Sequence, residues 1–225
     1  STQGKIIYDL IIENEIKHIL ELGIAHGTGS CYMAAALDEN KNGEIITIDN
    51  QSAIERKPNI FELAEKCNLS QYISPVFANS SYNWELMKLV DKNTVDGICQ
   101  PIFDFCYIDG AHNFEIDTCA FYLVDKLLKP NGLLLFDDLN WTYAKSPSLK
   151  NSDFVKNMTD EEKNTPHIKK LIELVVLPHP NYHKATNHDA WFLISKKDKN
   201  KIQKTNSINL KDHFPEKSFL ADIKN

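Results

Sequence analysis

Hydrophobic positions follow two alternating patterns along the chain. Short apolar runs are each followed by a stretch in which apolar residues recur at helical spacing. The apolar runs predict strands at His18–Leu22, Glu44–Asp49, Ile73–Ala78, Phe103–Ile108 and Leu133–Phe136. The stretches at helical spacing predict helices at Lys5–Glu15, Thr28–Leu37, Asn59–Asn68, Asn83–Val90 and Phe114–Leu128.

Strands that alternate with helices of crossover length predict a parallel sheet covered by helices on both faces. We therefore expect an α/β fold of the Rossmann-like, doubly wound type, with a mostly parallel seven-stranded sheet and an antiparallel last strand. After a helix at Pro166–Leu174, the strand-like runs Glu173–Leu177 and Ala190–Ser195 fit a hairpin that closes the sheet. Residues 140–164 are polar and irregular, which is typical of a lid or binding loop.

The length of 225 residues suits one large domain with a tail. We expect the domain to span residues 1–196 and the tail to span residues 197–225, which are rich in Lys and Asn. The tail contains one apolar patch, Phe214–Leu220, which could dock on its own domain or on a second copy of the chain. A homodimer is therefore one expectation, and the N-terminal helix is a second region suited to such a contact.

The composition argues against several classes of partner. The net charge is −6, and Arg56 is the only arginine, whereas nucleic-acid binders use basic, Arg-containing surfaces. We therefore expect no nucleic-acid partner. No apolar run reaches the roughly 18–20 residues of a membrane span, so we also expect no membrane partner. The five cysteines include no CxxC pair and no signal peptide is visible, which favours reduced thiols in the cytoplasm.

A glycine-rich loop comes directly after the first predicted strand, in HILELGIAHGTGS at residues 18–30. Glycine lets the backbone turn sharply and lets a ligand approach closely, and the start of the next helix offers free N–H groups. The spacing is GxxxGxG, with Glu21 two residues before Gly23, and it differs from the dinucleotide-binding GxGxxG. Taken alone, the loop could also be a tight turn without a ligand.

The second predicted strand ends at Asp49, within ITIDN. In nucleotide-binding α/β folds, an acidic residue at this point accepts hydrogen bonds from ribose hydroxyls. The alternative is an aspartate that only caps the end of the strand. Because Asp49 occurs together with the glycine-rich loop, ribose binding is the better interpretation.

Two later strands also end in acidic residues, in DFCYIDGAH at 104–112 and LLLFDDLN at 133–140. If these strands are neighbours about 4.8 Å apart, Asp109, Asp137 and Asp138 meet at one sheet edge. Carboxylates this close repel one another unless one is protonated or a cation lies between them. An all-oxygen cluster suits Mg²⁺, Mn²⁺ or Ca²⁺. The alternative is that only Asp109 touches a ligand and the Asp pair caps a loop.

Together these motifs, over roughly residues 5–196, resemble the class I S-adenosylmethionine-dependent methyltransferases. The ELGxxxG loop is similar to that of catechol and caffeoyl-CoA O-methyltransferases. YIDGAHNFEID followed by LLKPNGLLLFDDL is similar to metal-dependent sugar and macrolide O-methyltransferases, and to the cephalosporin-hydroxylase-like branch. The combination is specific, although no single piece is.

The resemblance implies a role for each matching residue. Gly23 and Gly27 would approach the methionine part of the cofactor, Asp49 would bind the ribose, and Asn79 and Ser80 would flank the adenine. The full cofactor-binding set would be Glu21, Gly23, Gly27, Ser30, Asp49, Asn79, Ser80 and Asp109. The ligands of the divalent ion would be Asp109, Asp137 and Asp138.

The chemistry implied by this resemblance is methyl transfer to a hydroxyl of a small molecule. The sulfonium of S-adenosylmethionine is a strong methyl donor, whereas a sugar hydroxyl is barely acidic. A bound dication lowers the pKa of a coordinated hydroxyl. His112 stands where catechol-type enzymes carry a lysine base, so it is a candidate general base, or a residue that orients a carboxylate. We expect a metal-dependent O-methyltransferase for a sugar, macrolide sugar or other natural-product diol.

Three alternatives stay open at this point. The chain could be an N-methyltransferase of a small amine, an oxidoreductase or hydroxylase on the same fold, or a domain that binds cofactor without catalysis. Iron hydroxylases usually need two His and one carboxylate, a trio that the predicted strand ends do not offer. Trp141 and Tyr143, in the irregular segment, fit stacking on a substrate ring or packing of the loop itself.

Overall fold

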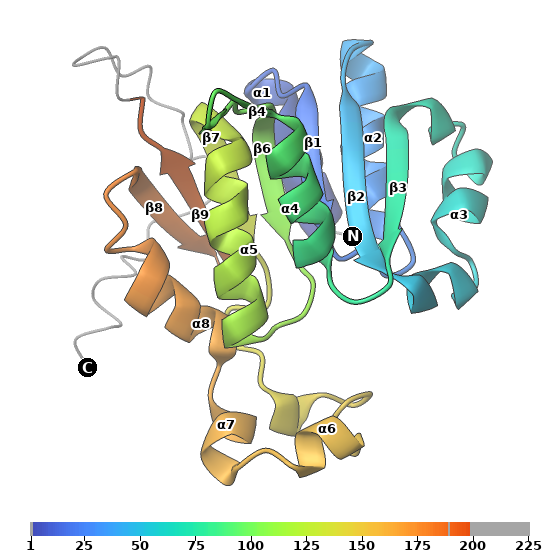
Figure 1. The fold of residues 1–225 in the computed structure, drawn as a ribbon. Coiled ribbons are helices and arrows are strands. Elements are labelled where there is room, and N and C mark those ends of the chain that lie inside the picture. The colour runs from blue at the N-terminus through green and yellow to red at the C-terminus, as the bar shows by residue number, and fades with distance from the viewer. Residues whose placement is uncertain (1, 189, 199–225) are drawn as a thin grey trace.

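A seven-stranded sheet forms the centre of the molecule, and the computed structural model describes residues 2–188 and 190–198 (Figure 1). The strand order is β3-β2-β1-β6-β7-β9-β8. β9 runs antiparallel to both of its neighbours, β7 and β8, and the other neighbouring pairs of this sheet are parallel, which confirms the predicted Rossmann-like sheet. The strands are β1 (His18–Leu22), β2 (Glu44–Asn50), β3 (Ile73–Ala78), β6 (Phe103–Ile108), β7 (Leu128–Phe136), β8 (Tyr182–His188) and β9 (Trp191–Lys196).

Helices cover both faces of the sheet (Figure 1). One face carries α1 (Thr2–Glu13), α2 (Thr28–Asn40) and α3 (Ile60–Lys66). The other face carries α4 (Tyr82–Lys92), α5 (Phe114–Leu127) and α8 (His167–Leu171). Shorter elements connect them: the 3₁₀ turns η1 (Gln51–Glu55) and η2 (Ser70–Tyr72), and a small hairpin of β4 (Thr94–Val95) and β5 (Ile98–Cys99).

The two faces of the sheet bury separate apolar clusters. Successive residues of a strand point to opposite faces, so a strand covered on both sides is apolar along its whole length. In β1, Ile19 packs against α1, α2 and α3, whereas Leu20 and Leu22 pack against α4, α5 and α8. This double burial explains why the buried positions of β1 are apolar, with Glu21 as the exception.

The segment between β7 and α8 forms a small lobe beyond the carboxyl ends of the parallel strands (Figure 1). The lobe contains η3 (Tyr143–Lys145), α6 (Asp153–Lys156) and α7 (Asp160–Asn164). The side chains of Ser152 and Thr159 cap the two short helices, and Thr159 does so in a capping box with Glu162. The segment predicted to be irregular therefore contains ordered helical turns.

The strand predicted at Glu173–Leu177 is wrong. Here α8 continues into a π-helical turn, η4 (Ile172–Val176), which buries Ile172 and Val176 in the core. The strand that pairs with β9 is instead β8, most of whose residues are half-buried or exposed. Because β8 lies at the edge of the sheet and buries little, it has no apolar run that the sequence pattern could detect.

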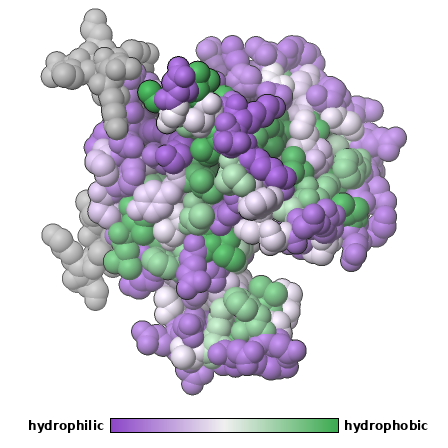
Figure 2. Space-filling view, viewed as in Figure 1, coloured by the Kyte–Doolittle hydropathy of each residue, from purple (hydrophilic) through white to green (hydrophobic). Residues whose placement is uncertain are grey.

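The surface is mostly polar, with an apolar area on the lobe (Figure 2). Within residues 2–188 and 190–198, no helix has the length and apolarity needed to cross a bilayer. The predicted apolar patch Phe214–Leu220, and nearly all of the predicted tail, lie outside the described residues. Homodimerisation and the absence of a nucleic-acid partner stay predictions.

Candidate active site

The glycine-rich loop joins β1 to α2 at the carboxyl edge of the sheet. Gly23 and Gly27 have φ values of 97° and 87°, a left-handed region that side chains rarely adopt. A Cβ atom on Gly23 would lie 2.0 Å from the carbonyl oxygen of Asp109. Glycine at position 23 therefore lets the end of β1 touch the end of β6.

Asp49 at the end of β2 braces this loop. Its Oδ2 accepts hydrogen bonds from the backbone N–H groups of Ile24, at 2.8 Å, and Ala25, at 3.0 Å. Asn79 and Ser80 follow β3 at the same edge of the sheet and are exposed. All three residues thus lie at the edge where the sequence predicted cofactor contacts, and their contacts with ribose and adenine stay predictions.

Glu21 is a buried carboxylate beneath the loop, only 1% exposed. It accepts hydrogen bonds from the hydroxyls of Ser30 and, at 2.6 Å, Thr47. Burial raises the pKa of Glu21 to about 7, and the two hydroxyl donors only partly oppose this effect. Ser30 is therefore linked to the proposed cofactor region by the hydrogen bond that its hydroxyl donates to Glu21.

A cavity of about 230 Å³ lies between the glycine-rich loop and the start of α1. It brings together Glu21, Gly23 and Asp109 of the predicted cofactor set, and Asp137 of the predicted metal set. Besides residues of the glycine-rich loop, the cavity is lined by six residues that carry no site signal in the sequence: Gln3, Gly4, Ile7, Tyr32, Tyr107 and Trp191. They come from α1, α2, β6 and β9, and nothing local in the sequence marks them as neighbours.

Three potential metal ligands gather beside this cavity. One ligand atom each from Asp109, His112 and Asp138 lies within 4.8 Å of the others. The Nε2 atom of His112 is 3.9 Å from Oδ1 of Asp109, and its Nδ1 atom is 3.4 Å from Oδ2 of Asp138. His112 and Asp138 both have left-handed backbone conformations, with φ of 52° and 55°. Such strain often marks functional sites.

The carboxylate of Asp137 forms its hydrogen bond with a residue outside this group of three ligands. Its Oδ2 accepts a hydrogen bond of 2.5 Å from the Tyr107 hydroxyl, which also lies 3.3 Å from Oδ2 of Asp109. The three predicted carboxylates therefore meet at one edge, because β6 and β7 are neighbours. The cluster of potential ligands contains His112 in place of Asp137.

The cluster carries unbalanced negative charge. Burial, followed by the charges of Asp137 and Asp138, raises the pKa of Asp109 well above its usual range. Burial also raises the pKa of Asp138, although His112 opposes this shift. A divalent cation would relieve the repulsion. The two carboxylates are oxygen donors of the kind that Mg²⁺ and Mn²⁺ take, whereas the imidazole suits a transition-metal ion such as Mn²⁺ better than Mg²⁺. The residues present therefore fit such an ion.

The loop between Asp109 and α5 is held from several elements that the sequence analysis did not connect with the site. The buried carboxylate of Asp117 accepts hydrogen bonds from the Tyr82 hydroxyl and, at 2.8 Å, from the N–H of Asn113. The Ala111 N–H donates to the Tyr82 hydroxyl oxygen at 3.4 Å, and the Tyr143 hydroxyl donates to the Ala111 carbonyl at 3.3 Å. These bonds fix the backbone on both sides of His112.

The family of the chain follows from comparison with known proteins. Residues 20–139 match a family model described as a methyltransferase domain. The match covers more than half of the chain and includes β1, the glycine-rich loop, Asp49 and the acidic cluster. Among curated proteins, no sequence matches the chain.

Solved structures share the fold. The O-methyltransferase from Bacillus cereus, in complex with S-adenosylhomocysteine, has a TM-score of 0.60 and 18% identity over 88% of this chain and 81% of that chain. TomG from Streptomyces achromogenes, involved in tomaymycin synthesis and bound to S-adenosylmethionine, has a TM-score of 0.59 and 15% identity, over 87% and 80%.

MycE, from the mycinamycin biosynthetic pathway, was solved in complex with Mg, S-adenosylhomocysteine and mycinamycin VI. Its TM-score is 0.52, with 16% identity over 91% of this chain and 50% of that chain. At these identities the likeness shows the fold, and the family match shows the class. The chain therefore belongs to the methyltransferase-domain family and is a class I S-adenosylmethionine-dependent methyltransferase.

Proposed function

We propose that the chain is a divalent-metal-dependent O-methyltransferase that acts on a hydroxyl of a small molecule. The observation that carries this proposal is the Asp109–His112–Asp138 cluster at the same sheet edge as the cavity of the glycine-rich loop. Asp109 belongs to both, so the ion-binding side chains and the cofactor cavity adjoin.

The cofactor-binding set is proposed from the same edge. Gly23 and Gly27 give the loop its left-handed turns and its close contacts with Asp109 and Ile60, and Glu21 with Ser30 supports the loop from below. Asp49 keeps the loop in shape and faces the ribose, and Asn79 and Ser80 lie where the adenine would end. Parallel α/β sheets bind ligands in this position, at the carboxyl ends of their strands.

Asp109, Asp138 and His112 are the proposed ligands of the divalent ion, with Mn²⁺ as the candidate that accepts both oxygen and imidazole donors, and Mg²⁺ as the alternative if only the carboxylates bind. When bound, the ion would supply the positive charge that makes a coordinated hydroxyl more acidic. Tyr107 holds the carboxylate of Asp137 through a hydrogen bond and keeps it at the wall of the cofactor cavity. In this arrangement Asp137 adds negative charge near the cluster without being one of the ligands.

The ligand role of His112 replaces the base role predicted from the sequence. A coordinating imidazole uses its lone pair on the ion, so it does not also accept a proton from the substrate. The 3.4 and 3.9 Å separations from two carboxylates favour the ligand role, and the indole of Trp141, 5.0 Å from the imidazole between ring centres, packs against it. The base role stays as the alternative that experiment has to separate.

For the substrate we propose only a broad chemical class. MycE was solved with mycinamycin VI, and TomG is involved in tomaymycin synthesis, so both act in natural-product pathways. A sugar, macrolide sugar or other natural-product diol remains our proposal for this chain, and the cytoplasm remains the proposed location. Two adjacent hydroxyls would suit the cluster, since both could face the same ion.

The ligand set can be tested by Mn²⁺ binding, which needs no acceptor substrate. Asp138→Asn and His112→Ala are expected to weaken Mn²⁺ binding at least tenfold in electron paramagnetic resonance titrations, because each removes one donor. Asp137→Asn is expected to leave the affinity within threefold, since Tyr107 engages that carboxylate. The matched controls are Asp91→Asn and His18→Ala, at an exposed and a half-buried position away from the cluster.

Unchanged Mn²⁺ binding in Asp138→Asn would overturn the metal site. Unchanged binding in His112→Ala together with lost turnover would restore His112 as a base, and a large loss in Asp137→Asn would restore that residue as a ligand. Turnover of a panel of catechols and sugar diols, with the product read by mass spectrometry and NMR, then tests O-methylation. Methyl transfer only to amines would favour the N-methyltransferase instead.

A further inference from the structure

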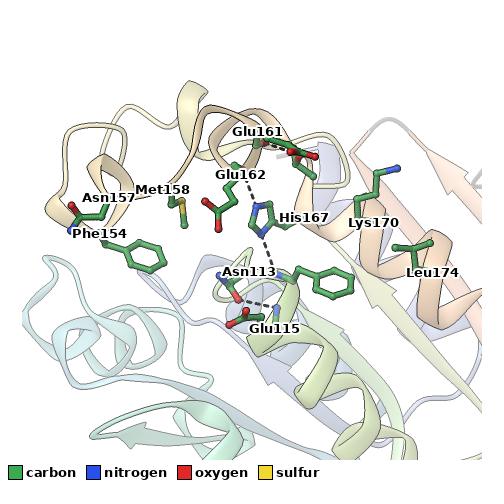
Figure 3. A pocket seen from close by; sticks show the side chains of 12 residues that line it. Asn113, Glu115, Phe154, Asn157, Met158, Glu161, Glu162, His167, Lys170 and Leu174 are labelled. Carbon is green, nitrogen blue, oxygen red and sulfur yellow. Dashed lines mark hydrogen bonds between the residues drawn. The ribbon is translucent and has the colours of Figure 1, made fainter.

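A second cavity, of about 580 Å³, opens between the lobe and the helices α5 and α8 (Figure 3). None of its lining residues also lines the cofactor cavity. Its wall includes Asn113, the residue after His112 in the loop that carries two of the proposed metal ligands. Pockets of this volume commonly hold small molecules.

The walls of this cavity are largely apolar. Phe154 and Met158 reach in from the lobe, and Leu174 lies on the other side (Figure 3). Phe114, the first residue of α5, also lines the cavity. Phe154 is 58% exposed and Leu174 63% exposed, which is unusual for large apolar side chains that share one hollow. Exposed apolar groups gathered around a cavity mark a surface that a ligand can cover.

The charges at this cavity are mainly negative. Glu115, Glu161 and Glu162 line it, together with the ammonium of Lys170. That ammonium is itself engaged by Glu173 at 2.8 Å. Figure 3 shows the Glu162 and Glu115 side chains on opposite sides of the hollow. The apolar walls therefore carry carboxylates that a positively charged group would complement.

The cavity is also connected to the proposed active site by rigid contacts. Nδ1 of His167 accepts a 3.1 Å hydrogen bond from the N–H of Phe114, at the start of α5, and its Nε2 lies 3.0 Å from the carbonyl oxygen of Glu162 in the lobe. The ring of Tyr143 packs against those of His167 and Phe154, at 5.2 and 5.7 Å between centres. The Tyr143 hydroxyl bonds the loop that carries His112 through Ala111.

We propose that this cavity binds an apolar small molecule that carries a basic nitrogen, and that it holds the unreactive end of the methyl acceptor. The second half rests on the proposed function; the first half does not. The acceptor is then an amphipathic amine, with its apolar body between Phe154 and Leu174, its ammonium beside Glu162, and its hydroxyl toward the loop that carries His112.

Binding is tested with two probes of equal size and opposite charge, 4-phenylbutylamine and 4-phenylbutyrate, by isothermal titration calorimetry on the full chain. We expect the amine to bind with a Kd on the order of 1 mM, as suits so small a ligand, and the carboxylate to bind at least tenfold more weakly. Saturation with S-adenosylhomocysteine is expected to leave amine binding in place, because the two cavities share no walls.

Two kinds of variant separate the apolar and the charged contributions. Phe154→Ser is expected to weaken both probes at least fivefold, with Trp84→Ser, at a residue of similar exposure on α4, as its control. Glu162→Gln keeps the capping box of α7, since glutamine can serve in it, and is expected to remove most of the preference for the amine. Glu65→Gln, exposed on α3, is its control.

Equal affinities for the two probes, or amine binding that survives Phe154→Ser, would overturn the proposal. If the cavity binds the amine but hydroxyl-bearing amines are not O-methylated in the presence of the metal, only the assignment of this cavity to the methyl acceptor is overturned. The amine-binding site itself then remains. Amine binding that fails while Mn²⁺ binding at the cluster is retained would remove the site and leave the proposed function. As a final arm, hydroxyl-bearing arylalkylamines are expected to be methylated at least tenfold faster than the matching carboxylates.

Discussion

At the scale of single residues, Glu21 belongs both to the buried interior of the fold and to the proposed cofactor site. Its carboxylate is buried beneath the glycine-rich loop with hydroxyl donors from α2 and β2. Burial raises its pKa from its ordinary 4.5 to about 7. Between these two pH values the folded chain keeps a proton on Glu21 that the unfolded chain has released. The free energy of unfolding therefore falls as pH rises through that window.

Glu21→Gln tests this linkage. Glutamine keeps a carbonyl oxygen for Ser30 and Thr47 and removes the ionisable proton. Between pH 5 and pH 8, ionisation of Glu21 is expected to lower the free energy of unfolding of the wild-type chain by up to about 3 kcal/mol. The Glu21→Gln variant is not expected to show this loss. Urea unfolding at several pH values measures the difference, with Glu65→Gln as the exposed control. Parallel pH curves for wild type and Glu21→Gln would contradict the assignment.

Gly23 is a residue-scale requirement of the same loop. Its φ is 97°, and an added Cβ atom would lie 2.0 Å from the Asp109 carbonyl oxygen, so a side chain cannot fit without backbone movement. Gly23→Ala is expected to cost more than about 2 kcal/mol of stability and to abolish the stabilisation by S-adenosylhomocysteine.

The matched control for this change is Gly97→Ala, in the turn between β4 and β5. Gly97 has a φ of 77°, and no atom of the described residues lies within 4 Å of an added Cβ, so the substitution brings backbone strain without a steric clash. It is expected to cost about 1 kcal/mol and to leave cofactor binding intact. Thermal unfolding with and without S-adenosylhomocysteine compares the two variants; equal behaviour would show that strain alone, and not contact with Asp109, makes glycine necessary.

At the scale of elements, the loop between β6 and α5 depends on its neighbours. The buried pair of Tyr82 on α4 and Asp117 on α5 holds the backbone around His112. Tyr82→Phe leaves the Asp117 carboxylate and the Ala111 N–H each without one partner. It is expected to cost about 1–3 kcal/mol of stability and to weaken Mn²⁺ binding several-fold. Tyr122→Phe, at a residue 49% exposed on α5, is the control for both measurements. A loss of stability with unchanged Mn²⁺ affinity would limit the pair to a structural role.

The elements also show where prediction from the sequence succeeds and where it does not. Strands such as β1 and β6, covered on both faces, are predictable because double burial leaves them mostly apolar, with Glu21 and Asp104 as the exceptions. The edge strand β8 escapes prediction because it lacks an apolar run. The apolar run at Glu173–Leu177 misleads, because a run this short suits a buried helical turn as well as a strand.

At the scale of the whole molecule, the proposed cofactor cavity is lined by residues of α1, α2, β6 and β9, so a ligand held there is expected to stabilise these elements together. S-adenosylhomocysteine at about 100 times its Kd adds about 2.7 kcal/mol, which for a chain of this size raises the Tm by roughly 5–10 °C. NAD is the control and is expected to cause no shift. Differential scanning fluorimetry measures both, and a shift with NAD alone would contradict the methyltransferase assignment.

The order of strands and helices, the glycine-rich loop after β1 and the acidic residues at the strand ends are all legible in the amino-acid sequence. These features have local causes: the periods of the two secondary structures and the turn chemistry of glycine. Four arrangements emerge only when the chain is folded. The Tyr107 hydroxyl donates a hydrogen bond to Asp137, His112 lies between Asp109 and Asp138, α1 closes the proposed cofactor cavity, and the lobe forms a second cavity with α5 and α8. They join residues far apart in the chain, and side-chain packing in three dimensions, which no local pattern encodes, selects them.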